Sequence, residues 1–438
     1  MTLAIALTAA AFVAFEIAIA QADPRPALAA ERTFGVAGGK VLVHFAGSGA
    51  DAPPAADADG NGVPDFVEQV AEEAERALVR FAALGFRAPI GDGTLGGDGR
   101  VDIYLANLIA ADGNARSDDC GAARCSGFAV AENDYAGFAY PSVREGIRSV
   151  VPHELFHLVQ NAYAVGRSPA WTEGSAVWSV EQLYGDGCAD FERFLPAFLR
   201  KTFRPLERSA GGFGDNYAYG AALWPLFLER RFGADAVVAA WEQSEQLEFL
   251  DAIGAALAPR GTTLEAAFVE FTRWNAFTGA RAAAHGWDGA AAWSEAPREE
   301  ALGAEGGRAF VEGYSARYVP FALAAPARIA LAPAKGLRVA GWVVADGGDP
   351  STGVELAAEE EGGALAATLE AGRYTLVLTG LSPRTITTPV DIAIGPPPPP
   401  KEEGCAATRG SGLSTGAPGL VGAIAFALRR RVRVRRAR

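Results

Sequence analysis

The stretch VPHELFHLVQNAYAVGRSPAWTEGSAVW, residues 151–178, decides how the rest of this 438-residue chain is interpreted. It holds His153 and His157 in the pattern H-E-x-x-H, with Glu154 directly after the first histidine. Side chains four residues apart share one face of an α-helix, about 5–6 Å apart, so both imidazoles can reach one small cation. The stretch therefore predicts a helix that carries two metal ligands on one face.

A catalytic zinc site needs a third protein ligand and an open position for water. The other two histidines, His44 and His285, lie far away in the sequence. Glu173 follows the turn-forming residues 166–169 and opens a second helical pattern, which would return its carboxylate to the histidine pair. Position 163, where a zinc protease with three histidines would have its last ligand, is Tyr163. We therefore expect a His2Glu zinc site.

The chemistry expected of this site is hydrolysis. Zinc would lower the pKa of its bound water to about 7, and Glu154 would act as general base and then as general acid. The developing oxyanion needs another donor, for which Tyr217 and Tyr219 are the candidates. The alternative for both tyrosines is a core position with locally bonded hydroxyls. The alternative for the motif is a coincidence on a surface helix, where the helix dipole favours Glu173.

The motif also resembles that of a known enzyme family. Residues 153–157, with Trp-Thr-Glu-Gly at 171–174 and Trp178, are similar to the gluzincin metallopeptidases, whose H-E-x-x-H and downstream Glu-Gly step carry zinc and catalysis. From the Asp57 loop through the Tyr217 region, the sequence resembles secreted, surface-sorted metalloproteases of the myxobacterial type. The resemblance implies a gluzincin-like catalytic domain that acts on a peptide or protein.

One departure from that family is Pro152, where relatives usually carry a small residue. Proline is tolerated in the first turn of a helix and disrupts its interior. We therefore expect the motif helix to begin near Ser149 or Val150.

A second metal is expected in the segment DADGNGVPDFVE, residues 57–68, which matches the calcium-loop pattern D-x-D-x-N-G-x5-E. The expected Ca2+ ligands are Asp57, Asp59, Asn61, Asp65 and Glu68. Only the exit helix, at residues 64–84 and ended by Gly85, is indicated, so one structural ion is expected rather than a paired EF-hand. The alternative is an ordinary acidic turn.

The remaining patterns predict an α+β chain. Strands are expected at residues 40–46, 101–105 and 127–131, and helices at residues 190–203, 217–232, 234–246 and 264–277. Since enzymes of the resembled class bind peptides by β-addition to a strand beside the active-site helix, residues 127–135 are the expected substrate edge. Asp92, Asp98 and Asp102 are expected to be solvated turn residues, with a second cation site as the alternative.

From about Gly307 the pattern changes to short alternating runs. These predict strands at residues 308–311, 316–323, 328–331, 338–344, 365–369 and 373–378. Strands at this spacing are typical of a small β-sandwich. The expected fold is therefore a gluzincin-like zinc peptidase domain over residues 23–300, built from a small sheet plus helices, followed by a C-terminal β-sandwich over residues 307–395.

Composition and both ends of the chain indicate export. Residues 1–22 are apolar and end in small-x-small cleavage patterns, which predicts a secretory signal; an uncleaved anchor or a wrongly assigned start is the alternative. A secreted chain would oxidise Cys120 and Cys125 to a small disulfide loop and leave Cys188 as a buried thiol or a partner in some other connectivity; a reduced C-x4-C pair is the alternative. The net charge of −13 argues against nucleic-acid binding.

The C-terminal end has the order of a sorting signal. A proline-rich linker at residues 396–404 leads into residues 405–438, which hold an apolar run and eight arginines. Gly404-Cys405 and this tail resemble the sorting signal of the myxobacterial type, which implies attachment to the cell surface or outer membrane. The alternative is a frayed tail that binds anionic lipid or nothing.

These patterns predict an exported, surface-anchored zinc metalloendopeptidase with a calcium loop. Two other functions stay open. One is a calcium-stabilised surface binding protein that keeps the scaffold without turnover, and the other is a zinc hydrolase of a non-peptide substrate.

Overall fold

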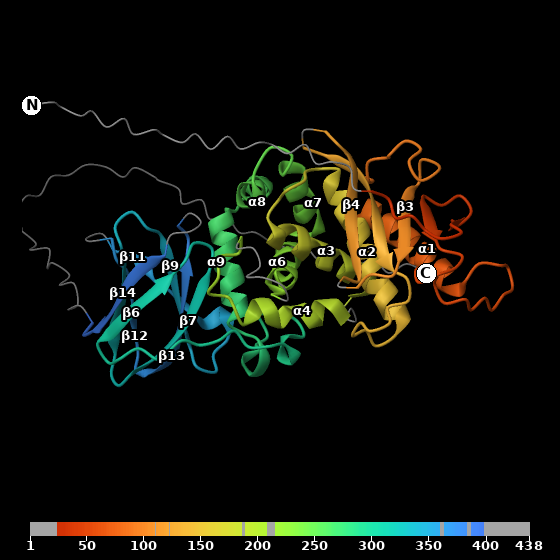
Figure 1. Cartoon of the computed structure of the whole chain (residues 1–438). Helices are drawn as coiled ribbons and strands as arrows, with labels where there is room; N and C mark the ends of the chain where they lie inside the picture. Colours follow the sequence, from red (N-terminus) through yellow and green to blue (C-terminus); the bar gives the residue numbers. More distant parts are fainter. Residues whose placement is uncertain are drawn as a thin grey trace, which may run out of the picture. The chain divides into compact units, whose positions relative to one another are not determined.

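The computed structural model describes residues 24–397, apart from residues 110, 122, 186–188, 208–214, 360–362 and 383–386. The expected signal, Cys188 and the C-terminal tail lie outside the described residues. The described residues form one compact unit. Its fold is α+β as predicted, with a sheet and helices followed by antiparallel strands (Figure 1).

A five-stranded sheet opens the fold, in the order β1-β2-β3-β5-β4. The strands are β1 (Arg32–Phe34), β2 (Val41–Phe45), β3 (Val101–Ala106), β4 (Gly113–Cys120) and β5 (Cys125–Glu132). β3 runs parallel to β2 and β5, whereas β1 and β4 run antiparallel to their neighbours. The three strands expected in this part of the chain are confirmed as β2, β3 and β5, but β1 and β4 were not predicted.

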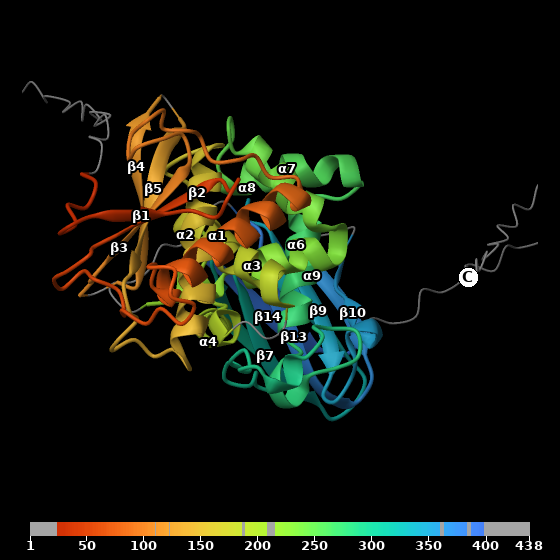
Figure 2. The ribbon, with the colours of Figure 1, turned by 90° about the vertical axis from the view of Figure 1, so that its right-hand side faces the viewer.

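The outermost strand beside β5 is β4, which Figure 2 shows at the margin of the sheet. β5 pairs with β3 on one side and with β4 on the other. The expectation that residues 127–135 form the substrate edge is therefore wrong, because a strand paired on both sides has no row of peptide groups left for an added strand. The predicted Cys120–Cys125 disulfide is present and closes the β4–β5 hairpin.

Helix α1 (Asp65–Leu84) packs its apolar face into the main core. Its buried residues recur every three or four positions, which gives an apolar stripe along one side of the helix. It ends at Gly85, whose φ of 100° is in the left-handed region that favours glycine at the end of a helix. The predicted helix and its end are confirmed.

Helix α2 (Val143–Asn161) carries the histidine motif and packs against α1, β4 and β5. The Ser142 side chain accepts a hydrogen bond from the backbone N–H of Glu145 and caps its start. The expected start near Ser149 or Val150 is therefore wrong, and Pro152 lies inside the helix. Proline in a helix interior removes one backbone hydrogen bond, a cost that the dense burial of the surrounding residues offsets.

Helix α3 (Pro169–Tyr184) returns alongside α2 after a short turn, as the sequence predicted. Its first turn is fixed by Trp171, which is fully buried and stacks on Trp241 and Phe249 at centroid distances of 5.5 Å. Such stacked aromatic side chains bury a large apolar area in a defined geometry. The start of α3 is therefore anchored by its packing against Trp241 and Phe249 of two later helices.

In the described part of the chain, six further α-helices follow. They are α4 (Ala189–Leu199), α5 (Tyr217–Gly220), α6 (Leu223–Phe232), α7 (Ala234–Gln243), α8 (Phe249–Leu257) and α9 (Leu264–Asn275). The helix expected at residues 217–232 is divided into α5 and α6, and α8 was not predicted. In the part of the chain that the structure describes, no helix has both the length and the apolar character to cross a membrane.

The C-terminal strands form two antiparallel sheets, ordered β10-β9-β13-β7 and β11-β12-β8-β14-β6. The strands are β6 (Gly306–Val311), β7 (Ala316–Leu323), β8 (Ala327–Pro333), β9 (Val339–Ala345), β10 (Val354–Glu355), β11 (Ala357–Ala358), β12 (Leu365–Leu369), β13 (Gly372–Gly380) and β14 (Thr388–Gly395). Apolar residues of both sheets share one core, as expected of a β-sandwich. The six predicted strands are confirmed, whereas β10, β11 and β14 were not predicted.

Candidate metal centre

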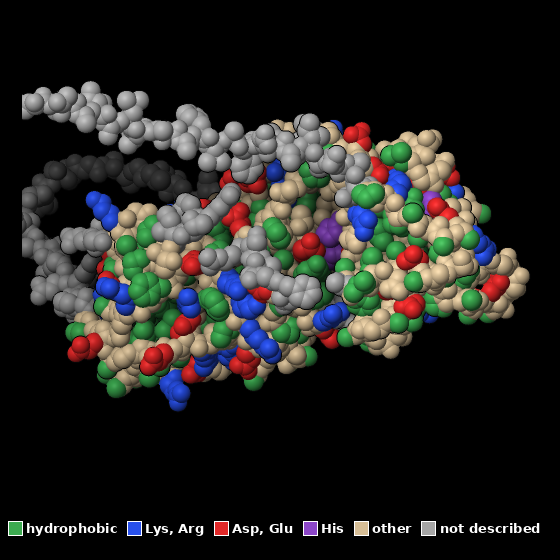
Figure 3. All heavy atoms as spheres, in the orientation of Figure 1, with side chains coloured by type: hydrophobic (Ala, Val, Ile, Leu, Met, Phe, Trp, Pro, Cys, Tyr) green, Lys and Arg blue, Asp and Glu red, His purple; other side chains and the backbone are tan. Residues whose placement is uncertain are grey.

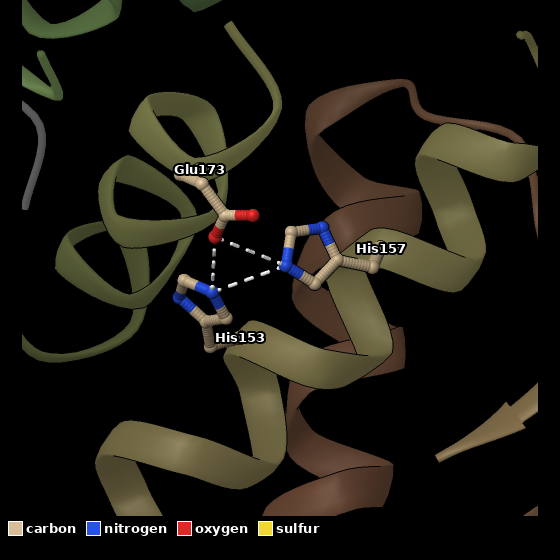
Figure 4. Close-up of side chains that lie close together, drawn as sticks. All are labelled: His153, His157 and Glu173. Carbon is tan, nitrogen blue, oxygen red and sulfur yellow. Dashed lines mark hydrogen bonds and ion pairs between the residues drawn. The ribbon is translucent and has the colours of Figure 1, made fainter. Parts of the chain in front are cut away.

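Three side chains converge between α2 and α3 (Figure 4). Nε2 of His153 lies 3.1 Å from Nε2 of His157. The Oε2 atom of Glu173 lies 3.2 Å from the first of these nitrogens and 3.4 Å from the second. Among the described residues, this is the group of His, Cys, Asp or Glu that offers three ligand atoms within 4.8 Å of one another. The acid expected on the returning helix therefore lies beside the histidine pair.

The spacing of these atoms fits a zinc ion. Tetrahedral zinc has ligand bonds of about 2.0–2.1 Å, which separates its ligand atoms by roughly 3.3 Å. The three measured separations lie around this value. Two imidazole nitrogens and one carboxylate oxygen are also a ligand set that catalytic zinc uses. The residues present therefore suit zinc in both geometry and chemistry.

The group is buried on one side and open on the other. The side chain of His153 is only 9% exposed, whereas those of His157 and Glu173 are 17% and 24% exposed. On the face shown in Figure 3, histidine side chains reach the surface next to acidic side chains. The open side leaves room for a water molecule or a substrate at a bound ion.

The electrostatics of the group favour a positive charge between the helices. Burial alone would lower the pKa of His157, but the Glu173 carboxylate raises it to about 9. Burial would raise the pKa of Glu173, but the two histidines hold it well below its ordinary value. A bound cation would take the place of the His157 proton and balance the negative charge of the Glu173 carboxylate.

Glu154 follows His153 on α2 and is also buried, with 7% exposure. Burial raises the pKa of Glu154 above its ordinary value, although the two histidines act in the opposite direction. A carboxyl group with a raised pKa beside a candidate metal site is typical of a general base or acid. Glu154 lies against Gly113, since a Cβ atom at Gly113 would lie 2.9 Å from its Cγ.

The two candidate tyrosines have different surroundings. The ring of Tyr219 stacks on His153 at a centroid distance of 5.7 Å. Burial and the nearby Glu173 raise the pKa of Tyr219 well above its ordinary value. Tyr217 is fully buried, and its hydroxyl donates to the carbonyl oxygens of Arg204 and Pro205. The expectation of Tyr217 as an oxyanion donor is therefore wrong, because its hydroxyl belongs to the core.

The other residues considered in the sequence analysis each have hydrogen-bond partners away from the ligand triangle. Tyr163 is fully buried, and its hydroxyl accepts a hydrogen bond from the backbone N–H of Arg87. His44 lies in β2 between Glu31 and Asp102, at 2.7 and 3.0 Å, which confirms it as a sheet residue. The other histidine outside the motif, His285, lies 2.7 Å from Asp349.

Two of the aspartates expected in turns are buried in an ion pair. The guanidinium group of Arg25 contacts Asp92, Asp102 and Asp118, whose side chains are 0–4% exposed. The prediction of solvated turn residues is therefore wrong for Asp92 and Asp102. The position considered for a second metal ion is instead filled by a guanidinium group.

The predicted calcium ligands are divided between the exposed loop before α1, which holds Asp57, Asp59 and Asn61, and the first turn of α1, which holds Asp65 and Glu68. Among the described residues, their carboxylates do not form a group of three ligand atoms within 4.8 Å of one another. The Asp57 carboxylate accepts hydrogen bonds from the backbone N–H groups of residues 60–62. The Asn61 amide nitrogen donates to Asp59 and Glu68, at 3.0 and 2.7 Å. The Asp65 carboxylate accepts from the backbone N–H of Ala58. The Asn61 amide thus bridges the Asp59 and Glu68 carboxylates.

Sequence reasoning missed two contributors to the site. The first is the start of β4, where Gly113 contacts Glu154 and the neighbouring Asp112 accepts a hydrogen bond from the Tyr140 hydroxyl. The second is Gln160, which lies within hydrogen-bond distance of His157. Only the spacing of Gln160, three residues after His157 on one helix face, was visible in the sequence.

Comparisons with known proteins add little. No protein-family model and no curated protein matches the chain. Among solved structures, part of the chain is similar to the pre-peptidase C-terminal domain of collagenase from Bacillus anthracis, with 13% sequence identity and a TM-score of 0.19. That match covers 23% of this chain and 99% of the other.

Proposed function

We propose that this protein is a zinc metalloendopeptidase of the gluzincin type. The observation that carries the proposal is the triangle of His153 Nε2, His157 Nε2 and Glu173 Oε2, with sides of 3.1–3.4 Å. Zinc, when bound there, would polarise the substrate carbonyl group and lower the pKa of a water molecule to about 7. The three side chains would hold the ion through two nitrogens and one oxygen.

Glu154 is proposed as the group that moves the proton. Its carboxylate interacts electrostatically with the histidine pair, and its side chain packs beside Gly113, where an added Cβ atom would clash with it. It would accept a proton from the attacking water and donate it to the leaving amine. Tyr219, stacked on His153, is the remaining candidate for donating a hydrogen bond to the oxyanion.

The outer edge of β4 is proposed to bind the peptide. The carbonyl oxygen of Asp112 accepts from the backbone N–H of Glu132, so residue 112 points its peptide groups towards β5. Because bonded and non-bonded pairs alternate along antiparallel strands, the peptide groups of Gly113 and Ala115 point away from β5. An extended substrate could add there as a strand, with its backbone passing Glu154.

Export and surface attachment belong to the same proposal. They are supported by the apolar residues 1–22, by the Cys120–Cys125 disulfide and by the arginine-rich residues 405–438. Disulfides persist in oxidising compartments outside the cytosol. The Ca2+ loop of residues 57–68 would then act as a stabilising element rather than as part of catalysis.

The test compares the parent protein with Glu154→Gln. Both should hold about one zinc ion per chain, while the variant should cleave unfolded protein substrates on the order of 100- to 10,000-fold more slowly. Glu145→Gln, on the same helix in an ion pair with Arg148, is the matched control and should retain activity. A parent that lacks bound zinc would contradict the proposal. A parent that holds zinc but cleaves only non-peptide esters or amides would support a different hydrolase.

A further inference from the structure

Gln160 is buried beside the candidate metal centre without belonging to the ligand set. It lies three residues after His157 on α2 and is 2% exposed. A buried amide group is costly unless its donors and its acceptor have partners. The hydrogen-bond partners of the Gln160 amide therefore show which neighbouring groups it orients.

The nitrogen of the amide faces α3. Nε2 of Gln160 lies 2.8 Å from the carbonyl oxygen of Thr172 and 3.1 Å from the hydroxyl oxygen of Ser175. A carbonyl oxygen can only accept a hydrogen bond, so the group facing Thr172 must be the NH2 group. The Ser175 hydroxyl donates to the carbonyl oxygen of Trp171 and is therefore an acceptor towards Gln160.

The oxygen of the amide consequently faces the histidine. Oε1 of Gln160 lies 2.8 Å from Nδ1 of His157. An amide oxygen can only accept, so Nδ1 of His157 carries the hydrogen atom of this bond. In the neutral ring the other nitrogen, Nε2, then has a free electron pair, and that nitrogen is the one that faces His153 and Glu173.

The same amide also joins the two helices of the site. Thr172 immediately precedes Glu173, so the hydrogen bond from Nε2 links Gln160 to the backbone beside the third candidate ligand. Ser175 accepts a further hydrogen bond from the indole N–H of Trp241, at 3.2 Å. Gln160 thus connects His157 of α2 to the start of α3 through a fully bonded buried network.

We propose that Gln160 is a positioning residue of the metal centre, which fixes the tautomer and the ring orientation of His157 and its distance from Glu173. This inference rests on the proposed zinc site and adds a residue to it. Partners that accept a hydrogen bond from the non-ligating nitrogen of a histidine typically change metal affinity 10- to 100-fold when removed. Gln160 would provide this acceptor as a neutral amide from the same helix.

The experiment measures zinc affinity of the full chain by chelator competition. Gln160→Met keeps the side-chain length and removes the hydrogen bonds to His157, Thr172 and Ser175, and should weaken zinc binding about 10- to 100-fold. The matched control is Gln182→Met, because the Gln182 amide bonds to Arg80 and Glu229 and touches no histidine. Its zinc affinity should equal that of the parent. An equal affinity in the parent and Gln160→Met would overturn the inference.

A second variant separates an effect on the orientation of the His157 ring from a general loss of protein stability. Gln160→Glu keeps an acceptor for Nδ1 of His157, a place that carboxylates commonly take beside ligating histidines, but it loses the donor to the Thr172 carbonyl oxygen. Its zinc affinity should therefore lie between those of the parent and of Gln160→Met. A loss as large as that of Gln160→Met would overturn the role assigned to the Nδ1 hydrogen bond. Long-range 15N–1H spectra of the zinc-loaded parent should show His157 bound through Nε2, and binding through Nδ1 would also overturn it.

These outcomes are distinct from failure of the proposed function. A parent that binds no zinc contradicts both the function and the positioning role. A parent that binds zinc, with an unchanged Gln160→Met, removes only the positioning role. A parent whose zinc affinity depends on Gln160 but which cleaves no peptide retains the positioning role and loses the peptidase.

Discussion

Gly113 of β4 lies so close to Glu154 of α2 that a side chain at residue 113 would displace its neighbours on that helix. A Cβ atom there would lie 2.4 Å from Cγ1 of Val150, 2.9 Å from Cγ of Glu154 and 3.0 Å from its Oε1 atom. Real Cβ atoms essentially never show contacts under 3.0 Å, so the neighbouring side chains would have to move. The position of the proposed proton carrier therefore depends on a glycine in a strand that the sequence did not reveal.

The first prediction follows from this contact. Gly113→Ala should displace Glu154 and lower kcat roughly 10- to 100-fold, because small misplacements of catalytic groups have effects of this size. Zinc content should be unchanged, since the contact does not involve the three ligands. Gly121→Ala in the same hairpin is the control, as its Cβ would meet its nearest atom at 3.7 Å. Full activity of Gly113→Ala would contradict the assignment of Glu154.

The second prediction concerns the loop of residues 57–68. Added Ca2+ should raise the melting temperature of the parent, because an ion that binds only the folded state stabilises it. Glu68→Gln, which removes the carboxylate that would close the site, should need at least about tenfold more Ca2+ for the same shift. Glu72→Gln, one turn further along α1, should behave as the parent. If neither added Ca2+ nor a Ca2+ chelator changes the melting temperature of the parent, the calcium site is contradicted.

The third prediction concerns Arg25. Its guanidinium group is the partner of three nearly fully buried carboxylates, those of Asp92, Asp102 and Asp118. Removing one partner of a buried ion pair typically costs about 3–5 kcal/mol, because a buried charge is left uncompensated. Arg25→Gln should lower the free energy of unfolding by about this amount in urea titrations. Arg308→Gln, from an exposed pair with Asp391, should cause little change.

The fourth prediction is a pH dependence of stability. Burial would lower the pKa of His44, but hydrogen bonds to Asp102 and Glu31 raise it above its ordinary 6.5. A raised pKa in the folded state adds stability that is fully present below about pH 6.5 and is lost as the pH rises through the folded pKa. The free energy of unfolding of the parent should therefore fall relative to His44→Gln above pH 6.5. A constant difference from pH 5 to 9 would refute the assignment.

The His153 motif and its partner acid could be predicted because their signals are local. The four-residue spacing, the turn at residues 166–169 and the following helical pattern together brought Glu173 back to His153 and His157. The strands of the second half were likewise visible as alternating apolar runs separated by turns. In both cases, neighbouring residues carry the information.

Features that depend on distant contacts were not predictable. β4 is polar, and its position is set by pairing with β5 rather than by its own pattern. Tyr217 and Tyr219 are two residues apart in one short helix, and only the packed structure directs one hydroxyl to Arg204 and the other ring to His153. The local rule for proline predicted the wrong start for α2, because the Ser142 cap and the burial of the residues around Pro152 decide where the helix begins.

The stack of Trp171 on Trp241 and Phe249 has a consequence for the acid two residues further along α3. Because the aromatic rings anchor the backbone at residue 171, α3 cannot slide towards α2 to compensate for a shorter acid at residue 173. An aspartate there would stop short of the histidines by about one carbon–carbon bond, roughly 1.5 Å. With the backbone anchored there, a glutamate at residue 173 reaches the two histidines, whereas an aspartate would not.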